Sequence, residues 1–388
     1  MVLSLWWTGC TTVPPRPAVA FTGNPITDGL AMREVAPPAD QALWDYRVAA
    51  AALRHGQVEI ARERLESGLS LAAAATSGPS GEAAASRRMF RRESDKPYVG
   101  EPYERVMANF YRGVLYWMDG EPDNARALFR NGLFLDSDTE DRTYAGDWVL
   151  LDYLDGLITR RLGGDGSDAR RRAETTAGRE LPPYDRAANV MLLVEYGRGP
   201  RKIAGGQSGE LLRFQVTPSK ITQARLRVAG EVVALPPYDD LNYQATTRGG
   251  RVMDHVLGNK AVFKQGASNV GDAAIFGAIA THELGRGEDK DEAALALVAI
   301  GILSKLTSAA TQTSADTRTW DNLPQYLSFA QLALPPGAHA AELEFLDAAG
   351  QVVPEKTQRF TIDVREPGTG IADRDAAALV VFRSEVPN

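Results

Sequence analysis

The sequence predicts an α+β protein in which helices fill the first half of the chain and strands dominate the second. From about residue 40 to 161, apolar residues recur at intervals of three and four, as on one face of an α-helix. After a Gly- and Pro-rich stretch at 163–186, they alternate with polar residues, as in half-buried strands. We therefore expect a helical domain at 40–162, a linker at 163–186 and a β-rich, sandwich-like domain at 187–388.

The composition is that of an ordinary globular protein with an excess of acidic groups. The 388 residues are 44% hydrophobic and 24% charged, and their formal net charge is −7. This balance gives no overall attraction to nucleic acid, so none is expected as a partner. The single cysteine, Cys10, excludes an intramolecular disulfide and any metal cluster held by several cysteines.

The N-terminal residues form an apolar run that ends in Thr8-Gly9-Cys10 and is followed by a Pro-rich stretch. This order resembles the end of a bacterial lipoprotein signal peptide, in which small residues precede a lipid-bearing cysteine. The resemblance implies a signal remnant at 1–10, a flexible tether at 11–39 and lipid attachment at Cys10. Such an anchor would hold the protein at the periplasmic face of the outer membrane. The alternative is an incidental free thiol.

Two predicted helical hairpins in the first half share a spacing of small and large residues. One follows the separations of a tetratricopeptide repeat, with Gly113, Tyr116, Gly120, Ala125 and Phe129. The other has the same separations, with Ala49, Ala52, Gly56, Ala61 and Leu65. Small residues let two helices approach closely, and the large residue fills the space between them. The spacing favours a tetratricopeptide-like helical domain over an unrelated helical bundle, which is the alternative.

Aromatic residues of the helix expected after Glu101 are candidates for a partner-binding surface, because stacked helical repeats bind peptides on their concave face. These candidates are Tyr103, Tyr111, Tyr116 and Trp117, and some of them are expected to be core residues instead. A concave face that is filled by other parts of the same chain would exclude this use.

Strand-like patterns recur at seven places in the second half. They lie at residues 190–196, 210–216, 223–229, 325–334, 340–346, 358–365 and 377–383. Helical periodicity interrupts them, so we expect inserted helices at about 248–308. The apolar run at 293–303 is shorter than the roughly 17–25 residues that cross a bilayer. A buried helix is favoured there, and an interfacial helix is the alternative.

Several motifs follow one another in a distinctive order along the chain. They are Glu101-Pro102-Tyr103-Glu104, the repeat at 113–129, the stretch at 194–202, and Asp316-x-Arg318-x-Trp320-x-x-Leu323-Pro324. Over residues 40–365 this order resembles an uncharacterised family of bacterial cell-envelope lipoproteins. The resemblance implies a tetratricopeptide-like domain, a C-terminal domain bearing the last motif, and partners among peptidoglycan-synthesis or surface-assembly components. It implies no activity.

The alternation of Asp316, Arg318 and Trp320 places them on one face of an extended segment. A carboxylate that fixes a guanidinium against an indole would lock two parts of the fold together. The alternative is a recognition patch for a partner or a glycan.

The stretch at 197–202 is rich in glycine and basic residues and follows a predicted strand. It lacks the spacing of a phosphate-binding loop, and Pro200 has no backbone N–H to donate. A tight, charged turn is favoured. As a functional site, its basic residues Arg198, Arg201 and Lys202 would bind an anionic envelope polymer.

Catalytic motifs are incomplete in this sequence. His282-Glu283 begins like a zinc-protease helix, but Arg286 stands where the second histidine is required. His255, His282 and Glu283 together would give a cell-wall hydrolase only with a nucleophile that the sequence does not identify. We therefore expect no enzymatic activity, no metal and no cofactor.

The sequence thus predicts a non-enzymatic, lipid-anchored periplasmic scaffold or adaptor that binds envelope proteins through its helical repeats. Two alternatives stay open. One is the cell-wall hydrolase, and the other is an assembly or secretion factor for a surface polymer.

Overall fold

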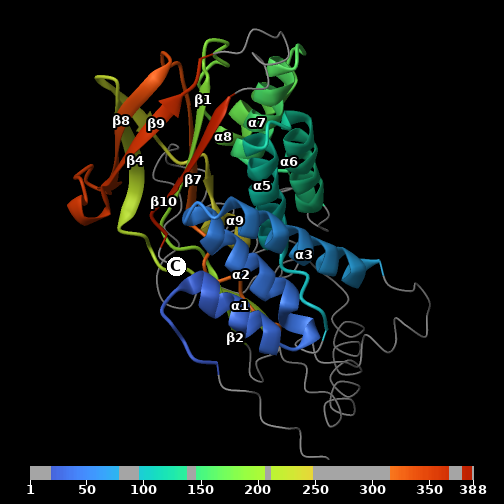
Figure 1. Cartoon of the computed structure of the whole chain (residues 1–388). Coiled ribbons are helices and arrows are strands. Elements are labelled where there is room, and N and C mark those ends of the chain that lie inside the picture. Colours follow the sequence, from blue (N-terminus) through green and yellow to red (C-terminus); the bar gives the residue numbers. More distant parts are fainter. Residues whose placement is uncertain are drawn as a thin grey trace, which may run out of the picture.

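The computed structural model describes residues 19–77, 96–137, 146–205, 211–247, 315–366 and 378–386. Helices come first in the chain and strands follow, which confirms the predicted α+β class. Figure 1 shows the helices on one side of the molecule and the sheets on the other. Cys10, the inserted helices expected at 248–308, and the candidates His255, His282 and Glu283 lie outside the described residues.

The helices largely occupy the predicted region. Their bounds are α1 Pro25–Val35, α2 Gln41–Arg54, α3 Val58–Thr76, α5 Pro102–Met118, α6 Pro122–Ser137, α7 Val149–Arg161, α8 Ser167–Ala177 and α9 Leu241–Thr246. Helix α1 lies within the region predicted as the tether. The side chain of Asn24 accepts the backbone N–H groups of Ile26 and Thr27 and so caps the start of this helix. Helix α8 falls within the predicted linker and packs on α7. None of the described helices has the length and apolarity that a membrane span requires.

Helices α2 and α3 form one hairpin, and α5 and α6 form another. In the first hairpin Gly68 of α3 lies against Tyr46 of α2, and in the second hairpin Gly113 of α5 lies against Phe129 of α6. A Cβ added to Gly113 would lie 2.6 Å from the ring of Phe129, so the two helix axes approach more closely than any larger residue allows. Ala49, Ala61 and Leu65 of the first hairpin are fully buried.

The strands form two four-stranded sheets and a separate hairpin. Their bounds are β1 Val190–Tyr196, β2 Arg201–Gly205, β3 Leu211–Gln215, β4 Ile221–Val228, β5 Glu231–Leu235, β6 Asp239–Asp240, β7 Tyr326–Leu332, β8 Gly337–Asp347, β9 Gln358–Val364 and β10 Leu379–Ser384. The first sheet has the order β10-β1-β7-β6, the second has β5-β4-β8-β9, and β2 pairs with β3. All seven predicted strands are present, whereas β2, β5 and β6 were not predicted.

Strand β1 is buried along its whole length because it lies between two cores. Its residues Val190, Leu192 and Val194 pack against the second sheet. The alternate residues Met191 and Leu193 pack against the helices. The structure therefore has three layers, helices, first sheet and second sheet, and the first sheet covers the inner face of the helices (Figure 1).

Asp239 of β6 ties the first sheet to the helical layer. Its two carboxylate oxygens accept the N–H groups of Val149 and Leu150 in the first turn of α7, at 2.8 and 2.9 Å. Burial raises the pKa of Asp239 to about 7, although these hydrogen bonds lower it, and the charges of Asp147 and Asp136 raise it further.

We expect an Asp239→Asn variant to reveal a pH dependence of stability. The pKa of Asp239 rises from about 3.9 in the unfolded chain to about 7 in the fold. Between these values the folded state binds the extra proton, so this residue lowers the free energy of unfolding as pH rises. The free energy of unfolding of the wild type minus that of the variant should decrease as the pH is raised from about 4 to 7, by at most about 1.4 kcal/mol per pH unit. Urea unfolding at a series of pH values measures this difference, and a constant difference would contradict the assignment.

Candidate functional site

The segment that carries the Asp-x-Arg-x-Trp motif lies between the helices and the β2–β3 hairpin. Arg318 forms ion pairs with Asp316 at 2.7 Å and with Asp40 at 2.9 Å, and it donates to the carbonyl of Ala39 at 3.1 Å. Burial lowers the pKa of Arg318, but the two carboxylates outweigh that effect and the net pKa is raised. Arg318 thus joins the motif segment to the start of α2.

Trp320 is fully buried and stacks on Tyr46 of α2, with ring centroids 4.8 Å apart and planes 15° from parallel. Its backbone N–H donates to Glu104 of α5 at 2.9 Å. The predicted stack of guanidinium on indole is therefore wrong, because Arg318 lies 5.6 Å from the ring of Tyr98 instead. The motif does connect two parts of the fold, but Arg318 and Trp320 do so through separate contacts, with Asp40 and with Tyr46.

Glu104 and Lys202 form an ion pair that is almost completely removed from solvent. The remaining acceptor capacity of Glu104 is used by the N–H groups of Trp320 and Glu101. Burial raises the pKa of Tyr98 and of Tyr103, and the charge of Glu104 raises both further. A buried charge that is paired and hydrogen-bonded in this way is stable, whereas an isolated one is not.

A second buried ion pair connects the helices to the middle of the first sheet. Glu195 of β1 accepts from Arg54 of α2 at 2.5 Å, from the hydroxyl of Tyr111 at 2.6 Å and from Ser384 of β10 at 2.7 Å. Burial lowers the pKa of Arg54, but Glu195 outweighs it and the net pKa is raised. The helical and β layers are thus joined by two buried charge pairs.

The aromatic candidates on α5 do not form a binding surface. Tyr103, Tyr111 and Trp117 are each only 1% exposed, because the sheet and the motif segment cover them. Tyr116 is partly exposed, and the guanidinium of Arg112 lies 3.6 Å from its ring centroid. The prediction of a partner surface is therefore wrong for Tyr103, Tyr111 and Trp117, which are core residues.

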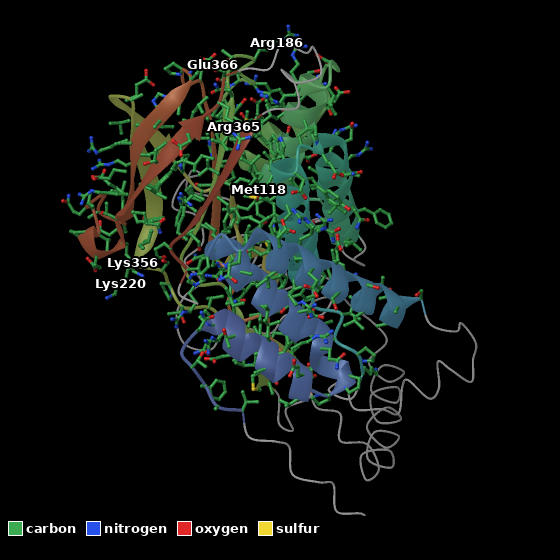
Figure 2. All side chains as sticks on the ribbon, viewed as in Figure 1. Met118, Arg186, Lys220, Lys356, Arg365 and Glu366 are labelled. Carbon is green, nitrogen blue, oxygen red and sulfur yellow. The ribbon has the colours of Figure 1, made fainter. Side chains whose placement is uncertain are left out.

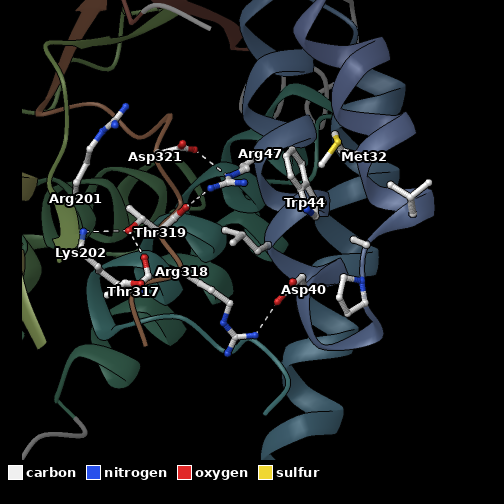
Figure 3. Close-up of a pocket in the computed structure, with 14 residues that line it drawn as sticks. Met32, Asp40, Trp44, Arg47, Arg201, Lys202, Thr317, Arg318, Thr319 and Asp321 are labelled. Carbon is white, nitrogen blue, oxygen red and sulfur yellow. Dashed lines mark hydrogen bonds and ion pairs between the residues drawn. The ribbon is translucent and has the colours of Figure 1, made fainter. Parts of the chain in front are cut away.

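The basic turn and the motif segment instead meet at one surface depression, which we call the Trp44 groove. It consists of two adjoining cavities, of about 550 and 310 Å³. Helices α1 and α2 form one wall, and β2 with the turn before it forms the other (Figure 3). Both cavities share the residues Met32, Trp44, Arg47, Arg201 and Asp321.

The charged groups of the Trp44 groove differ in whether they have partners. Arg47 pairs with Asp321 at 2.9 Å, donates to the carbonyl of Thr319 at 2.7 Å and lies 4.7 Å from the ring centroid of Trp44. By contrast, Arg198 and Arg201 are exposed and have no ion-pair partner among the residues that the structure describes. Within the described part of the chain, the groove therefore presents two exposed guanidinium groups without a carboxylate partner.

The end of the motif holds the basic turn in place. Leu323 is fully buried, and its carbonyl accepts the N–H of Gly199 at 3.0 Å. A Cβ at position 199 would lie 2.7 Å from the carbonyl oxygen of Pro324, so only glycine fits there. This contact fixes the chain directly between Arg198 and Arg201.

Most residues that line the Trp44 groove were not predicted from the sequence as site residues. Among them are Phe21, Met32, Trp44 and Arg47. The available signal was the large aromatic Trp44, which lies next to the apolar stripe of α2 rather than within it and is only partly buried. Phe21 is 70% exposed, which is unusual for a phenylalanine.

No group of three or more potential metal ligands is found in the part of the chain that the structure describes. Comparison with protein-family models, with curated proteins and with solved structures finds no match to this chain.

Proposed function

We propose that the protein is an adaptor of the bacterial cell envelope, anchored by a lipid on Cys10 at the periplasmic face of the outer membrane. In this proposal the Trp44 groove binds the partner, a component of peptidoglycan synthesis or surface assembly. The observation that carries the proposal is the convergence of the basic turn and the Asp-x-Arg-x-Trp segment on one groove. Convergent polar groups beside an apolar wall are typical of a binding site.

The helical hairpins have a different task in this proposal from the one that their sequence suggests. We interpret α2–α3 and α5–α6 as tetratricopeptide-like units whose inner face binds the chain's own sandwich-like β domain. Tyr111 and Trp117 then serve as core residues of that internal contact. The partner protein would bind at the junction between the helices and β2, where the Trp44 groove lies.

The position of the groove suits a membrane-anchored protein. Phe21 lines the groove and stands eleven residues after Cys10 in the sequence. A chain of that length spans at most about 40 Å. A lipid on Cys10 would therefore hold the groove close to the membrane surface, where envelope assembly proteins are found.

Metabolic labelling with a radioactive fatty acid tests the anchor. We expect label on the wild-type protein and on a Thr12→Ala control, and none on Cys10→Ala, because the thiol is the proposed site of attachment. The variant should also leave the membrane fraction. Equal labelling of wild type and Cys10→Ala would overturn lipid attachment at this residue.

Site-specific photo-crosslinking in cells tests the partner surface. A photoreactive amino acid at the exposed position Thr317, which lines the groove, should give a product with one envelope protein. The same amino acid at Phe134, which is 69% exposed on α6, serves as the matched control. Products at position 134 but none at 317 would show that the partner binds elsewhere.

A further inference from the structure

We infer that the ligand of the Trp44 groove is an acidic peptide segment that also carries apolar side chains. The inference rests on the proposed function only for the choice of the groove as the partner surface. It specifies the chemistry of that partner, and it is tested with purified protein, so it does not depend on lipid attachment or location.

Two exposed guanidinium groups form the cationic part of the groove. Arg198 and Arg201 line the same cavity, while the other cations around the groove, Arg47, Lys202 and Arg318, already have carboxylate partners. Arginine binds carboxylates through two parallel N–H donors, which makes it suited to acidic side chains. The contact of Gly199 with Leu323 holds the turn between the two arginines in place.

The opposite wall of the groove carries most of its apolar side chains, beside the charged residues Asp28 and Arg47. Met32 and Val35 come from α1, Leu43 and Trp44 come from α2, and Phe21 lines the smaller cavity. Figure 3 shows Met32 and Trp44 facing the motif segment across the cavity, with Arg201 on the far side. Aliphatic side chains of a ligand would therefore find an apolar contact opposite the two cations.

This combination favours a peptide over a glycan or a simple anion. Sugar hydroxyls need free acceptors, but the lining carboxylates Asp40 and Asp321 are already bound to Arg318 and Arg47. The third lining carboxylate, Asp28, accepts hydrogen bonds from Thr22 and Gly23. A simple anion would gain nothing from the apolar wall. The larger cavity, of about 550 Å³, lies within the usual range of roughly 300–1,000 Å³ for ligand sites.

Fluorescence anisotropy with a defined probe tests the inference. The probe is a labelled ten-residue peptide of alternating Glu and Leu, titrated with the purified full-length chain. We expect saturable binding that weakens as salt is added, because part of the attraction is between charges. Peptides of alternating Lys and Leu, and of alternating Glu and Ser, should bind much more weakly, because each lacks one half of the required chemistry.

Charge reversal locates the binding. The double variant Arg198→Glu/Arg201→Glu should weaken binding of the Glu-Leu peptide by about tenfold or more, since two charge-assisted contacts are lost. The matched control is Arg186→Glu/Arg365→Glu, which changes two exposed arginines at the opposite end of the molecule from α1 and β2 (Figures 1 and 2). A Trp44→Ala variant removes part of the apolar wall and should weaken binding without altering charge. Circular dichroism confirms that each variant is folded.

Several results would overturn the inference. They are no binding of the Glu-Leu peptide by the wild type, equal binding by both double variants, and equal binding of the Glu-Ser and Glu-Leu peptides. A photoreactive amino acid at Thr317 should crosslink to the probe. If the photoreactive group reacts instead within the same chain or with a second copy of the protein, the groove is occupied by that segment or copy, and the inference of a partner peptide is wrong.

Discussion

Replacement of Lys202 by methionine is expected to lower the free energy of unfolding by about 3–5 kcal/mol. The change leaves the carboxylate of Glu104 buried between α5 and the motif segment without its cation. Chemical unfolding of the purified variant, followed by circular dichroism, measures the loss.

A double-mutant cycle separates the charge pair from the loss of packing. Glu104→Gln alone should destabilise the protein because it leaves the Lys202 ammonium buried and unpaired. The double variant Glu104→Gln/Lys202→Met holds no buried charge at this position, so its loss should be at least about 1 kcal/mol smaller than the sum of the two single losses. Additive losses would show that the two groups do not interact in the folded protein.

Trp320→Ala is expected to lower the free energy of unfolding by a similar amount, about 3–5 kcal/mol. The indole is fully buried and stacks on Tyr46, so truncation leaves a cavity between α2 and the motif segment. The matched control is Trp44→Ala, since Trp44 is only partly buried at the groove and its loss should be about 1 kcal/mol. Urea midpoints of the two variants measure the contrast. Equal losses would contradict the role of Trp320 as the residue that joins the motif segment to the helices.

Local apolar patterns predicted most of the strands. Strand β1 was predicted at its observed bounds, because an apolar run broken only by Glu195 and followed by a Gly-rich turn is typical of a buried strand. Its neighbours in the sheet were not predictable in the same way. Strand β10 pairs with it in parallel and β7 in antiparallel orientation, and both come from the far end of the chain.

Strand β2 was missed because its first residues, Arg201 and Lys202, resemble a solvated basic turn. Lys202 is buried only because Glu104, 98 positions earlier in the sequence, lies against it in the fold. A buried charge depends on a distant partner, and local pattern carries no information about that partner. One usable signal was Glu195, a single carboxylate within an otherwise apolar strand, which indicates a buried ion pair.

The candidate site was predicted in parts and not as a whole. Arg198, Arg201 and the Asp-x-Arg-x-Trp segment were singled out separately, and the structure brings them to one groove. Their convergence with Trp44 depends on how α2 and β2 are placed on the two sides of the groove, which is a tertiary property. The aromatic residues of α5 were misplaced because their helical spacing is the same for a binding face and for a core that another layer covers.

The contact of Arg318 with Ala39 spans 279 positions of the sequence, and that of Arg47 with Thr319 spans 272. During synthesis, α2 and α5 are made long before the segment that supplies the Trp320 ring to Tyr46 and the Trp320 N–H to Glu104. Contacts between such distant segments form late and slowly during folding. A nascent chain that stops before residue 315 should therefore be degraded or aggregate rather than accumulate as a folded helical domain.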